Sequence, residues 1–177
     1  NVYKERIQNN DWLQDATKAK AIKKLDTLSV HVGYPDELPP YYEKFNISSY
    51  EEGSNIVEEN VKNSRIINEY QFSQYNKKRN KNLWGMPASM VNAYFNPTNN
   101  QIVFPAAILQ KPYYSLDQSS SANYGGIGAV IAHEISHAFD NNGAKFDENG
   151  SLSNWWTEQD LESFNKKAED MITLFDG

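Results

Sequence analysis

The sequence of 177 residues contains no cysteine and only three histidines. Without cysteine, neither a disulfide framework nor a zinc site with thiolate ligands can form. No apolar run approaches the roughly 20 residues that a membrane-spanning helix needs. Positive charge is also scarce, because 17 Lys and Arg residues stand against 23 Asp and Glu residues. The resulting net charge of −6 argues against nucleic acid as a partner.

The apolar content of 39% is enough for a hydrophobic core, and the length suits one domain or a piece of a larger protein. The N-terminal residues do not form a signal peptide, and the first residue is Asn1 rather than Met. We therefore expect the sequence to start inside a longer protein.

The most informative stretch is the motif H-E-x-x-H at residues 133–137, which lies in an apolar run. We predict one continuous helix over residues 125–140. Side chains four residues apart leave the same face of a helix, so His133 and His137 can bind one Zn²⁺ ion from one side. Glu134 lies beside this pair without needing to ligate the metal, which suits a general base acting on a metal-activated water.

Two readings without catalysis compete with a zinc enzyme. In the first, His133 and His137 are buried core histidines of a structural helical domain, and the motif is a coincidence. In the second, the chain is a non-catalytic module that binds peptides without a metal. The glutamate within the motif argues against the second reading, because binding alone needs no base.

A catalytic zinc site of this type has three protein ligands, and the motif supplies two. The extension with a third histidine would place Gly at position 140 and His at 143, but the sequence has Asp140 and Gly143. The other common solution is a later glutamate in an E-x-x-x-D pattern, and no glutamate after the motif has aspartate four residues on. We expect either an irregular carboxylate ligand or a third ligand beyond residue 177.

The rest of the sequence predicts a mostly helical α+β chain with a small hairpin or sheet beside the metal-binding helix. We expect a helix from residue 10 or 11 to residue 28 with lysines on its solvent face, then a strand over residues 29–33. A capping box at Ser48 or Ser49 should open a helix that ends near residue 74. Residues 90–95 and 101–104 should form a hairpin.

After the metal-binding helix, we expect Thr157 to cap a final helix with an apolar stripe that belongs to the core rather than to a binding surface. The stripe consists of Leu161, Phe164, Ala168, Met171, Ile172 and Phe175. The basic run over residues 76–81 marks a predicted boundary between a helical lead-in, residues 1–82, and a catalytic core, residues 83–177.

Several segments together give a specific resemblance over nearly the whole chain. They are residues 12–13, 17–18, 33–35, 91–95, 101–109, 123–128, 133–140 and 155–157. With these motifs the chain resembles the neprilysin family of zinc metalloendopeptidases (M13), and most of all its bacterial endopeptidase O members.

The resemblance implies part of a thermolysin-like zincin catalytic domain, with His133 and His137 as zinc ligands and Glu134 as the general base. Asn92 and the Ala93 backbone would belong to the edge strand that pairs with the substrate, although Asn92 could also be an ordinary hairpin residue. The expected substrates are oligopeptides, cut on the amino side of hydrophobic residues.

The family's third ligand, a glutamate in an E-N-x-x-D motif, and its later transition-state-stabilising histidine have no counterpart in this sequence. We therefore expect this chain to need the remainder of a catalytic domain, and to be inactive and at most a weak zinc binder alone. A bacterial cytoplasmic location is expected, with a surface-associated or secreted parent as the alternative.

Overall fold

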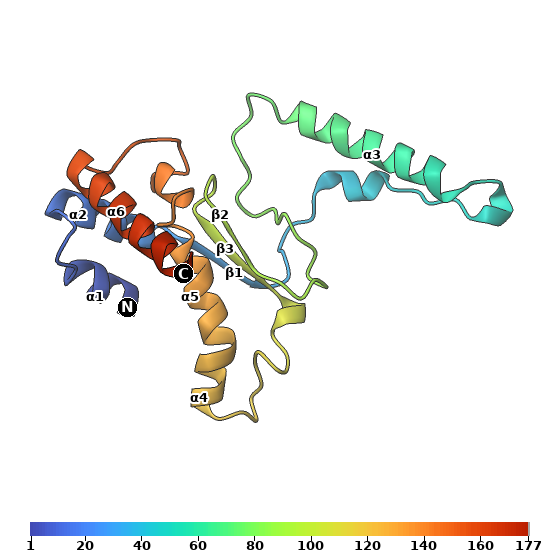
Figure 1. Ribbon diagram of the computed structural model, residues 1–177. Helices are drawn as coiled ribbons and strands as arrows, with labels where there is room; N and C mark the ends of the chain where they lie inside the picture. The colour runs from blue at the N-terminus through green and yellow to red at the C-terminus, as the bar shows by residue number, and fades with distance from the viewer. Residues whose placement is uncertain (177) are drawn as a thin grey trace. The chain divides into compact units, whose positions relative to one another are not determined.

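A computed structural model describes residues 1–176 and has the predicted mostly helical α+β character (Figure 1). Its α-helices are α1 (Val2–Gln8), α2 (Asp15–Asp26), α3 (Ile56–Ser73), α4 (Ser120–Asn123), α5 (Ala129–Ser136) and α6 (Glu158–Phe175). The strands are β1 (Ser29–Gly33), β2 (Tyr94–Asn96) and β3 (Gln101–Pro105). Within residues 1–176, no helix has both the length and the apolar character needed to cross a membrane.

The three strands form one sheet in the order β1-β3-β2. Strand β1 runs parallel to β3, with Val30 opposite Ile102, and β2 runs antiparallel to β3, with Phe95 also opposite Ile102. All of β3 is buried, and the core around it contains Ala93, Ile102, Phe104, Ile108 and Ile127. The predicted strand at 29–33 and the hairpin are confirmed, although the first hairpin strand begins at Tyr94 rather than at residue 90.

The described residues form two compact units. One unit contains residues 1–34 together with residues 87 onward, and the other contains Pro35–Met86. This grouping differs from the predicted division at residue 82, because β1 pairs with β3 and so joins the N-terminal segment to the later part of the chain. The H-E-x-x-H motif lies entirely in the first unit.

Helix α2 differs from its predicted extent and orientation. It begins at Asp15, because the Asn10 side chain accepts hydrogen bonds from the backbone of residues 12 and 13 in a turn that precedes the helix. The buried face carries Thr17, Ala21 and Lys24. The prediction that all the lysines face solvent is therefore wrong for Lys24, whose ammonium is satisfied inside the protein.

The helix that carries the motif is longer at its start and shorter at its end than the predicted 125–140. Helical structure runs from Ser120 through a π-helical turn at Tyr124–Gly128 into α5, which ends at Ser136 (Figure 1). At the π turn, Gly126 packs so closely on Tyr113 that a Cβ atom would lie 2.3 Å from the Tyr113 carbonyl oxygen. The chain leaves the helix after the second histidine because residues 138–146 fold into a separate turn.

In the second unit, Ser49 and Glu52 form the predicted capping box, but it opens only a short 3₁₀ turn, Tyr50–Glu52. Helix α3 follows with its own cap, since the Asn55 side chain accepts from the backbone N–H groups of Val57 and Glu58. It ends at Ser73, close to the predicted residue 74.

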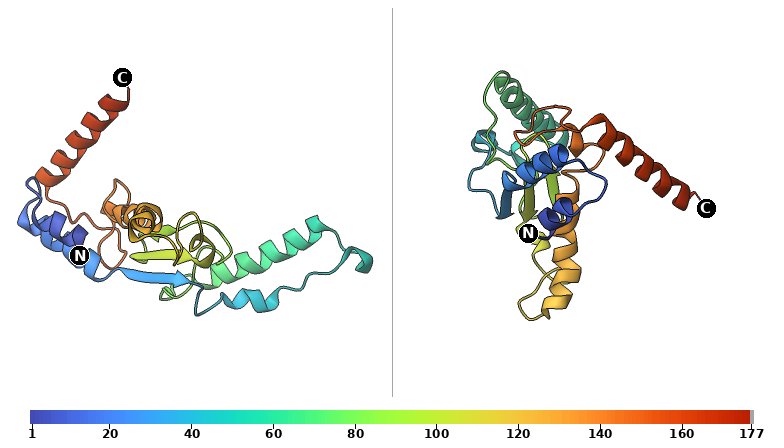
Figure 2. Two further views of the ribbon diagram at one scale, coloured as in Figure 1. Left: turned by 90° about the horizontal axis from the view of Figure 1, so that it is seen from below. Right: turned by 90° about the vertical axis from the view of Figure 1, so that its left-hand side faces the viewer.

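Helix α6 is capped by Thr157, as predicted, and its buried Asp160 anchors its first turn. Asp160 accepts hydrogen bonds from the Gln14 backbone at the start of α2. The prediction that the apolar stripe of α6 is core is wrong for every member except the partly buried Phe164, and Met171, Ile172 and Phe175 in the second half of the helix are exposed. Figure 2 shows this half of α6 standing clear of α1 and α2.

Candidate active site

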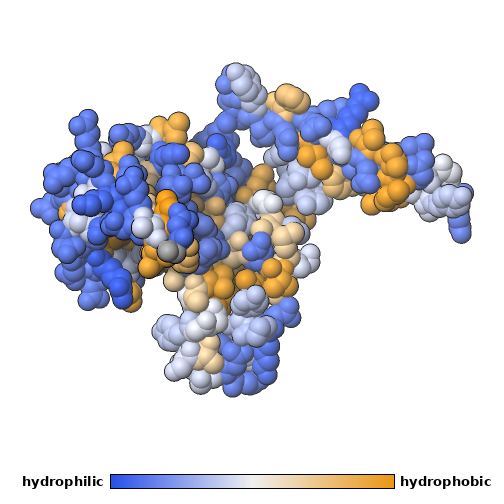
Figure 3. Space-filling view, in the orientation of Figure 1, coloured by the Kyte–Doolittle hydropathy of each residue, from blue (hydrophilic) through white to orange (hydrophobic). Residues whose placement is uncertain are grey.

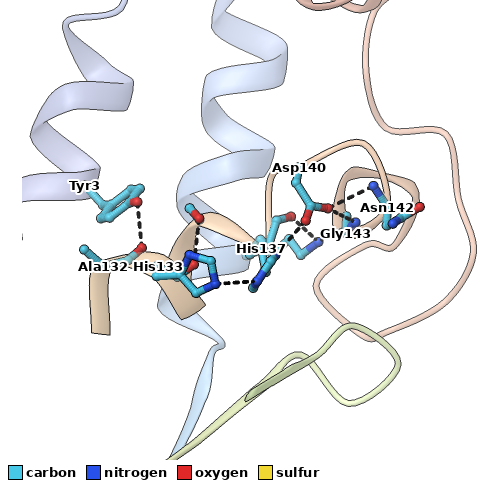
Figure 4. Close-up of polar contacts among 10 residues, drawn as sticks. Tyr3, Ala132, His133, His137, Asp140, Asn142 and Gly143 are labelled. Carbon is cyan, nitrogen blue, oxygen red and sulfur yellow. Dashed lines mark hydrogen bonds and ion pairs between the residues drawn. The ribbon is translucent and has the colours of Figure 1, made fainter. Parts of the chain in front are cut away.

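Helix α5 presents His133 and His137 on one face, as their spacing predicts (Figure 4). The two Nε2 atoms are 3.1 Å apart, and the ring centroids are 4.5 Å apart. Both rings lie at the surface of a cavity of about 380 Å³ that residues of this unit line. The imidazoles therefore converge on one point that solvent can reach.

This separation fits two ligands of one zinc ion. Tetrahedral zinc binds imidazole nitrogen at about 2.0–2.1 Å, so two nitrogen ligands lie roughly 3.3 Å apart. The observed 3.1 Å between the Nε2 atoms is close to that value. Neutral imidazole nitrogen is also a donor type that zinc prefers.

Asp140 fixes the orientation of His137. Its Oδ2 atom lies 2.7 Å from His137 Nδ1, while its Oδ1 atom accepts from the backbone N–H groups of Asn142 and Gly143 (Figure 4). A proton on Nδ1 leaves Nε2 with a free lone pair for a metal. Burial raises the pKa of Asp140, but these hydrogen bonds outweigh burial and hold the pKa below its ordinary value.

Glu134 is buried in the wall of the same cavity, with 5% of its surface exposed. Burial raises the pKa of Glu134, while the neighbouring His133 and His137 and a backbone hydrogen bond from Phe95 act in the opposite direction. The net result is a raised pKa, which makes the carboxylate a better proton acceptor than an exposed glutamate.

The predicted substrate segment lies beside these residues. Asn92 and Ala93 line the cavity with His133, Glu134 and His137. They precede β2 rather than forming part of it, so the predicted strand position is wrong by one residue for Ala93 and by two for Asn92. Strand β2 itself is at an edge of the three-stranded sheet, and Asn92 is exposed whereas Ala93 is buried.

A third protein ligand is not brought to the histidines. Among residues 1–176, no group of three or more His, Asp or Glu side chains is arranged to hold a metal ion. Asp140 is engaged with His137 and with the backbone. The described part of the chain therefore offers two candidate ligands, His133 and His137, with the carboxylates of Glu134 and Asp140 beside them.

Two residues that the sequence did not identify hold the site from other helices. Tyr3 in α1 donates its hydroxyl hydrogen bond to the Ala132 carbonyl, 2.9 Å away and next to His133 (Figure 4). Lys24 in α2 donates to carbonyls in the turn after His137. The only sequence signal for Lys24 is its position between Ala21 and Leu28, three to four residues from each.

The chain matches family models described as peptidase family M13 over residues 1–35 and 92–177. A Streptococcus gordonii protein whose name describes a zinc metalloproteinase is 56% identical over 176 residues, which are 99% of this chain and 31% of that protein. The neutral endopeptidase of Lactococcus lactis is 51% identical over 99% of this chain and 27% of its own length. The chain thus spans about a third or less of these curated relatives.

Solved structures show the same relation. The crystal structure of PEPO from Lactobacillus rhamnosis superposes with a TM-score of 0.85 at 43% identity, covering 93% of this chain and 26% of that one. The zinc metalloprotease ZMP1 of Mycobacterium tuberculosis, in complex with an inhibitor, gives a TM-score of 0.82 at 38% identity over 95% and 25%.

Proposed function

Because this chain belongs to peptidase family M13, we propose that it forms part of the catalytic region of a zinc metalloendopeptidase. The observation that carries the proposal is the convergence of the two Nε2 atoms, 3.1 Å apart, on a cavity whose wall contains the buried Glu134. In this proposal His133 and His137 hold the metal. Zinc, when bound, supplies a Lewis acid that polarises a carbonyl and acidifies a water molecule.

Glu134 acts as the general base. Its carboxylate takes a proton from the attacking water and later delivers that proton to the leaving amine of the cleaved peptide bond. The raised pKa of Glu134 makes its carboxylate a stronger base for the first of these proton transfers. Asp140 keeps His137 in the orientation that a metal ligand needs.

The substrates we propose are oligopeptides in an extended conformation, cut on the amino side of hydrophobic residues. Asn92 and the Ala93 backbone lie at the cavity and lead into the edge strand β2, so they are placed to hydrogen-bond to such a chain. The hydrophobic preference comes from the family resemblance. A bacterial cytoplasmic location stays a prediction.

Alone, this chain should bind zinc weakly or not at all and should lack peptidase activity. Two imidazoles leave zinc short of its usual three protein ligands, and no carboxylate ligand offsets the charge of the dication. In a complete enzyme of the family, we propose that the third ligand comes from a segment outside the residues described.

A chimera tests this proposal. The corresponding 176 residues of the Lactococcus lactis neutral endopeptidase are replaced by this chain, which is 51% identical to them. We expect about one zinc per molecule and hydrolysis of a peptide with an internal hydrophobic residue. The variant His133→Ala should lose both, and His31→Ala should lose neither. A folded chimera that neither binds zinc nor hydrolyses the peptide would contradict the proposal. The 177-residue chain alone would also contradict it if it bound zinc with sub-micromolar affinity and cleaved the peptide.

A further inference from the structure

Lys24 is a buried cation that the proposed mechanism does not use. It lies in the last turn of α2 with 1% of its surface exposed. Its Nζ atom donates hydrogen bonds to the carbonyl oxygens of Ala138 at 2.8 Å, Gly143 at 2.7 Å and Phe146 at 2.6 Å. An ammonium group has three N–H donors, so these three acceptors use its full capacity.

All three acceptors belong to the turn over residues 138–146, which starts directly after His137. Gly143 is held through both of its backbone groups, since its N–H donates to Asp140 Oδ1 and its carbonyl accepts from Lys24. The same Asp140 contacts His137 Nδ1 through its other oxygen. Lys24, the 138–146 turn, Asp140 and His137 therefore form one continuous chain of hydrogen bonds.

We propose that Lys24 is a positioning residue for the metal site, which fixes the 138–146 turn so that Asp140 can orient the imidazole of His137. The proposal rests on the proposed function in assigning His137 to the metal. The positioning itself concerns only residues of this chain and can be measured without a metal.

The surroundings of Lys24 indicate that its charge, and not only its bulk, matters. The ammonium lies 5.8 Å from the ring centroid of Phe95 and 5.7 Å from that of Trp155, on ring faces that favour a cation. Burial lowers the pKa of Lys24 to about 8, opposed by the charges of Asp147 and Asp140, so the group is mainly protonated at neutral pH.

An uncharged side chain of the same size would fill the space but remove one hydrogen bond from each of three carbonyl oxygens. The Gly143 and Phe146 oxygens would keep the Phe146 N–H and the Trp155 indole N–H, whereas the buried Ala138 oxygen would lose the donor that Lys24 gives it. Unpaired buried acceptors are costly, so the turn would rearrange to reach water. That rearrangement would release the Gly143 N–H from Asp140, and with it the constraint on His137. A purely space-filling role for Lys24 predicts no such effect on the imidazole.

The absence of cysteine allows a test that exchanges only the ammonium. Lys24→Cys is alkylated in denaturant with 2-bromoethylamine, which restores an amine at the lysine length, or with 1-bromopropane, which gives an uncharged chain of equal length. Both products are refolded. The Nδ1–H resonance of His137 is recorded by ¹⁵N NMR on metal-free protein at one pH. Zinc affinity is titrated separately on the chimera with and without Lys24→Met.

We expect the aminoethylated protein to show the wild-type Nδ1–H resonance of His137 and the propylated protein to lack it. Zinc affinity should fall about 10-fold in the chimera with Lys24→Met, as for other groups that orient a ligand. Thr17→Val is the control, since Thr17 is equally buried in α2 but accepts its hydrogen bond from Thr157, away from the turn. It should lower stability and leave the His137 resonance in place.

Identical His137 resonances in the aminoethylated and propylated proteins would overturn the positioning role, as would loss of the resonance in Thr17→Val. A changed resonance in the propylated protein, with no zinc binding by the chimera, would support the positioning role while removing the proposed metal site. Failure of one proposal is therefore distinguishable from failure of the other.

Discussion

Helices α5 and α3 differ in how their positions are determined. Helix α3 has 18 residues and a regular side-chain cap, yet Val57, Val61 and Phe72 on it are exposed, and Figure 3 shows hydrophobic residues at the surface along it. Helix α5 has only eight residues, with a π turn before it and a tight turn after it. Nevertheless, the Ala132 carbonyl of α5 accepts from Tyr3 in α1, its Glu134 accepts from the Phe95 backbone in β2, and Lys24 holds the turn that follows the helix.

The comparison shows that a strong helical pattern and a well-fixed helix are different properties. Helix α3 is defined by local interactions, such as the Asn55 cap. In contrast, α5 and the turn after it are held by hydrogen bonds from Tyr3 and Lys24, which lie more than 100 residues away in sequence. A metal site needs the second property, because ligand positions must hold to within a fraction of an ångström.

The largest expected difference in stability comes from removing a phenylalanine side chain from the sheet and from α3. Phe104→Ala in β3 should lower the free energy of unfolding by about 3–5 kcal/mol, because Phe104 is 3% exposed and its removal leaves a cavity. Phe72→Ala in α3 should change it by less than about 0.5 kcal/mol, since Phe72 is 82% exposed. Urea denaturation measures both values. Equal losses would mean that α3 is as well packed as the sheet.

A glycine pair around the motif sharpens the comparison. In Gly143→Ala the new Cβ would lie 1.8 Å from the His137 carbonyl oxygen, so the 138–146 turn must move. We expect Gly143→Ala to lower the free energy of unfolding by about 3 kcal/mol. In Gly125→Ala the Cβ meets no atom within 4 Å, and a gain of about 0.5–1 kcal/mol should follow from the less flexible unfolded chain. If Gly143→Ala is as stable as Gly125→Ala, the turn is not closely packed on the helix.

A smaller, pH-dependent effect is expected at the contact between α6 and α2. Burial opposes ionisation of Asp160, but hydrogen bonds from Thr17, Thr157 and the Gln14 backbone lower its pKa below the ordinary value. A lowered carboxyl pKa stabilises the folded state above about pH 4, and that stability is lost as the pH falls through the folded-state pKa.

Asp160→Asn should therefore lower the free energy of unfolding by about 1.5–3 kcal/mol at neutral pH and by less at acidic pH. Unfolding by urea at a series of pH values measures this difference, and Asp170→Asn on the exposed part of α6 is the control. A cost that does not depend on pH would contradict the assigned role of the Asp160 charge.

Much of the local structure was predictable because it depends on neighbouring residues. The 29–33 strand, the Thr157 cap and the shared face of His133 and His137 follow from alternation, capping chemistry and helical spacing. What the sequence did not predict depends on distant groups. Lys24 was assigned to solvent because periodicity cannot show three carbonyl acceptors that lie 114 to 122 residues away.

The early end of α5 was missed for the same reason, since the turn that ends it is stabilised by Lys24 and by the Asp140 side chain. The exposed half of α6 was missed because an apolar stripe does not specify what covers it. For Lys24 and for α6, the helical pattern along the chain was predicted correctly, and what surrounds the helix was not.

The central claim is that Glu134 on α5 is the base of a zinc peptidase, and the same substitution made in both helices of the chimera tests it most directly. Glu134→Gln keeps the size of the side chain and removes its basicity, so hydrolysis should fall about 10²–10⁴-fold while one zinc remains bound. Glu58→Gln on exposed α3 should change neither quantity. Undiminished hydrolysis in Glu134→Gln, or loss of its zinc, would contradict the assigned role.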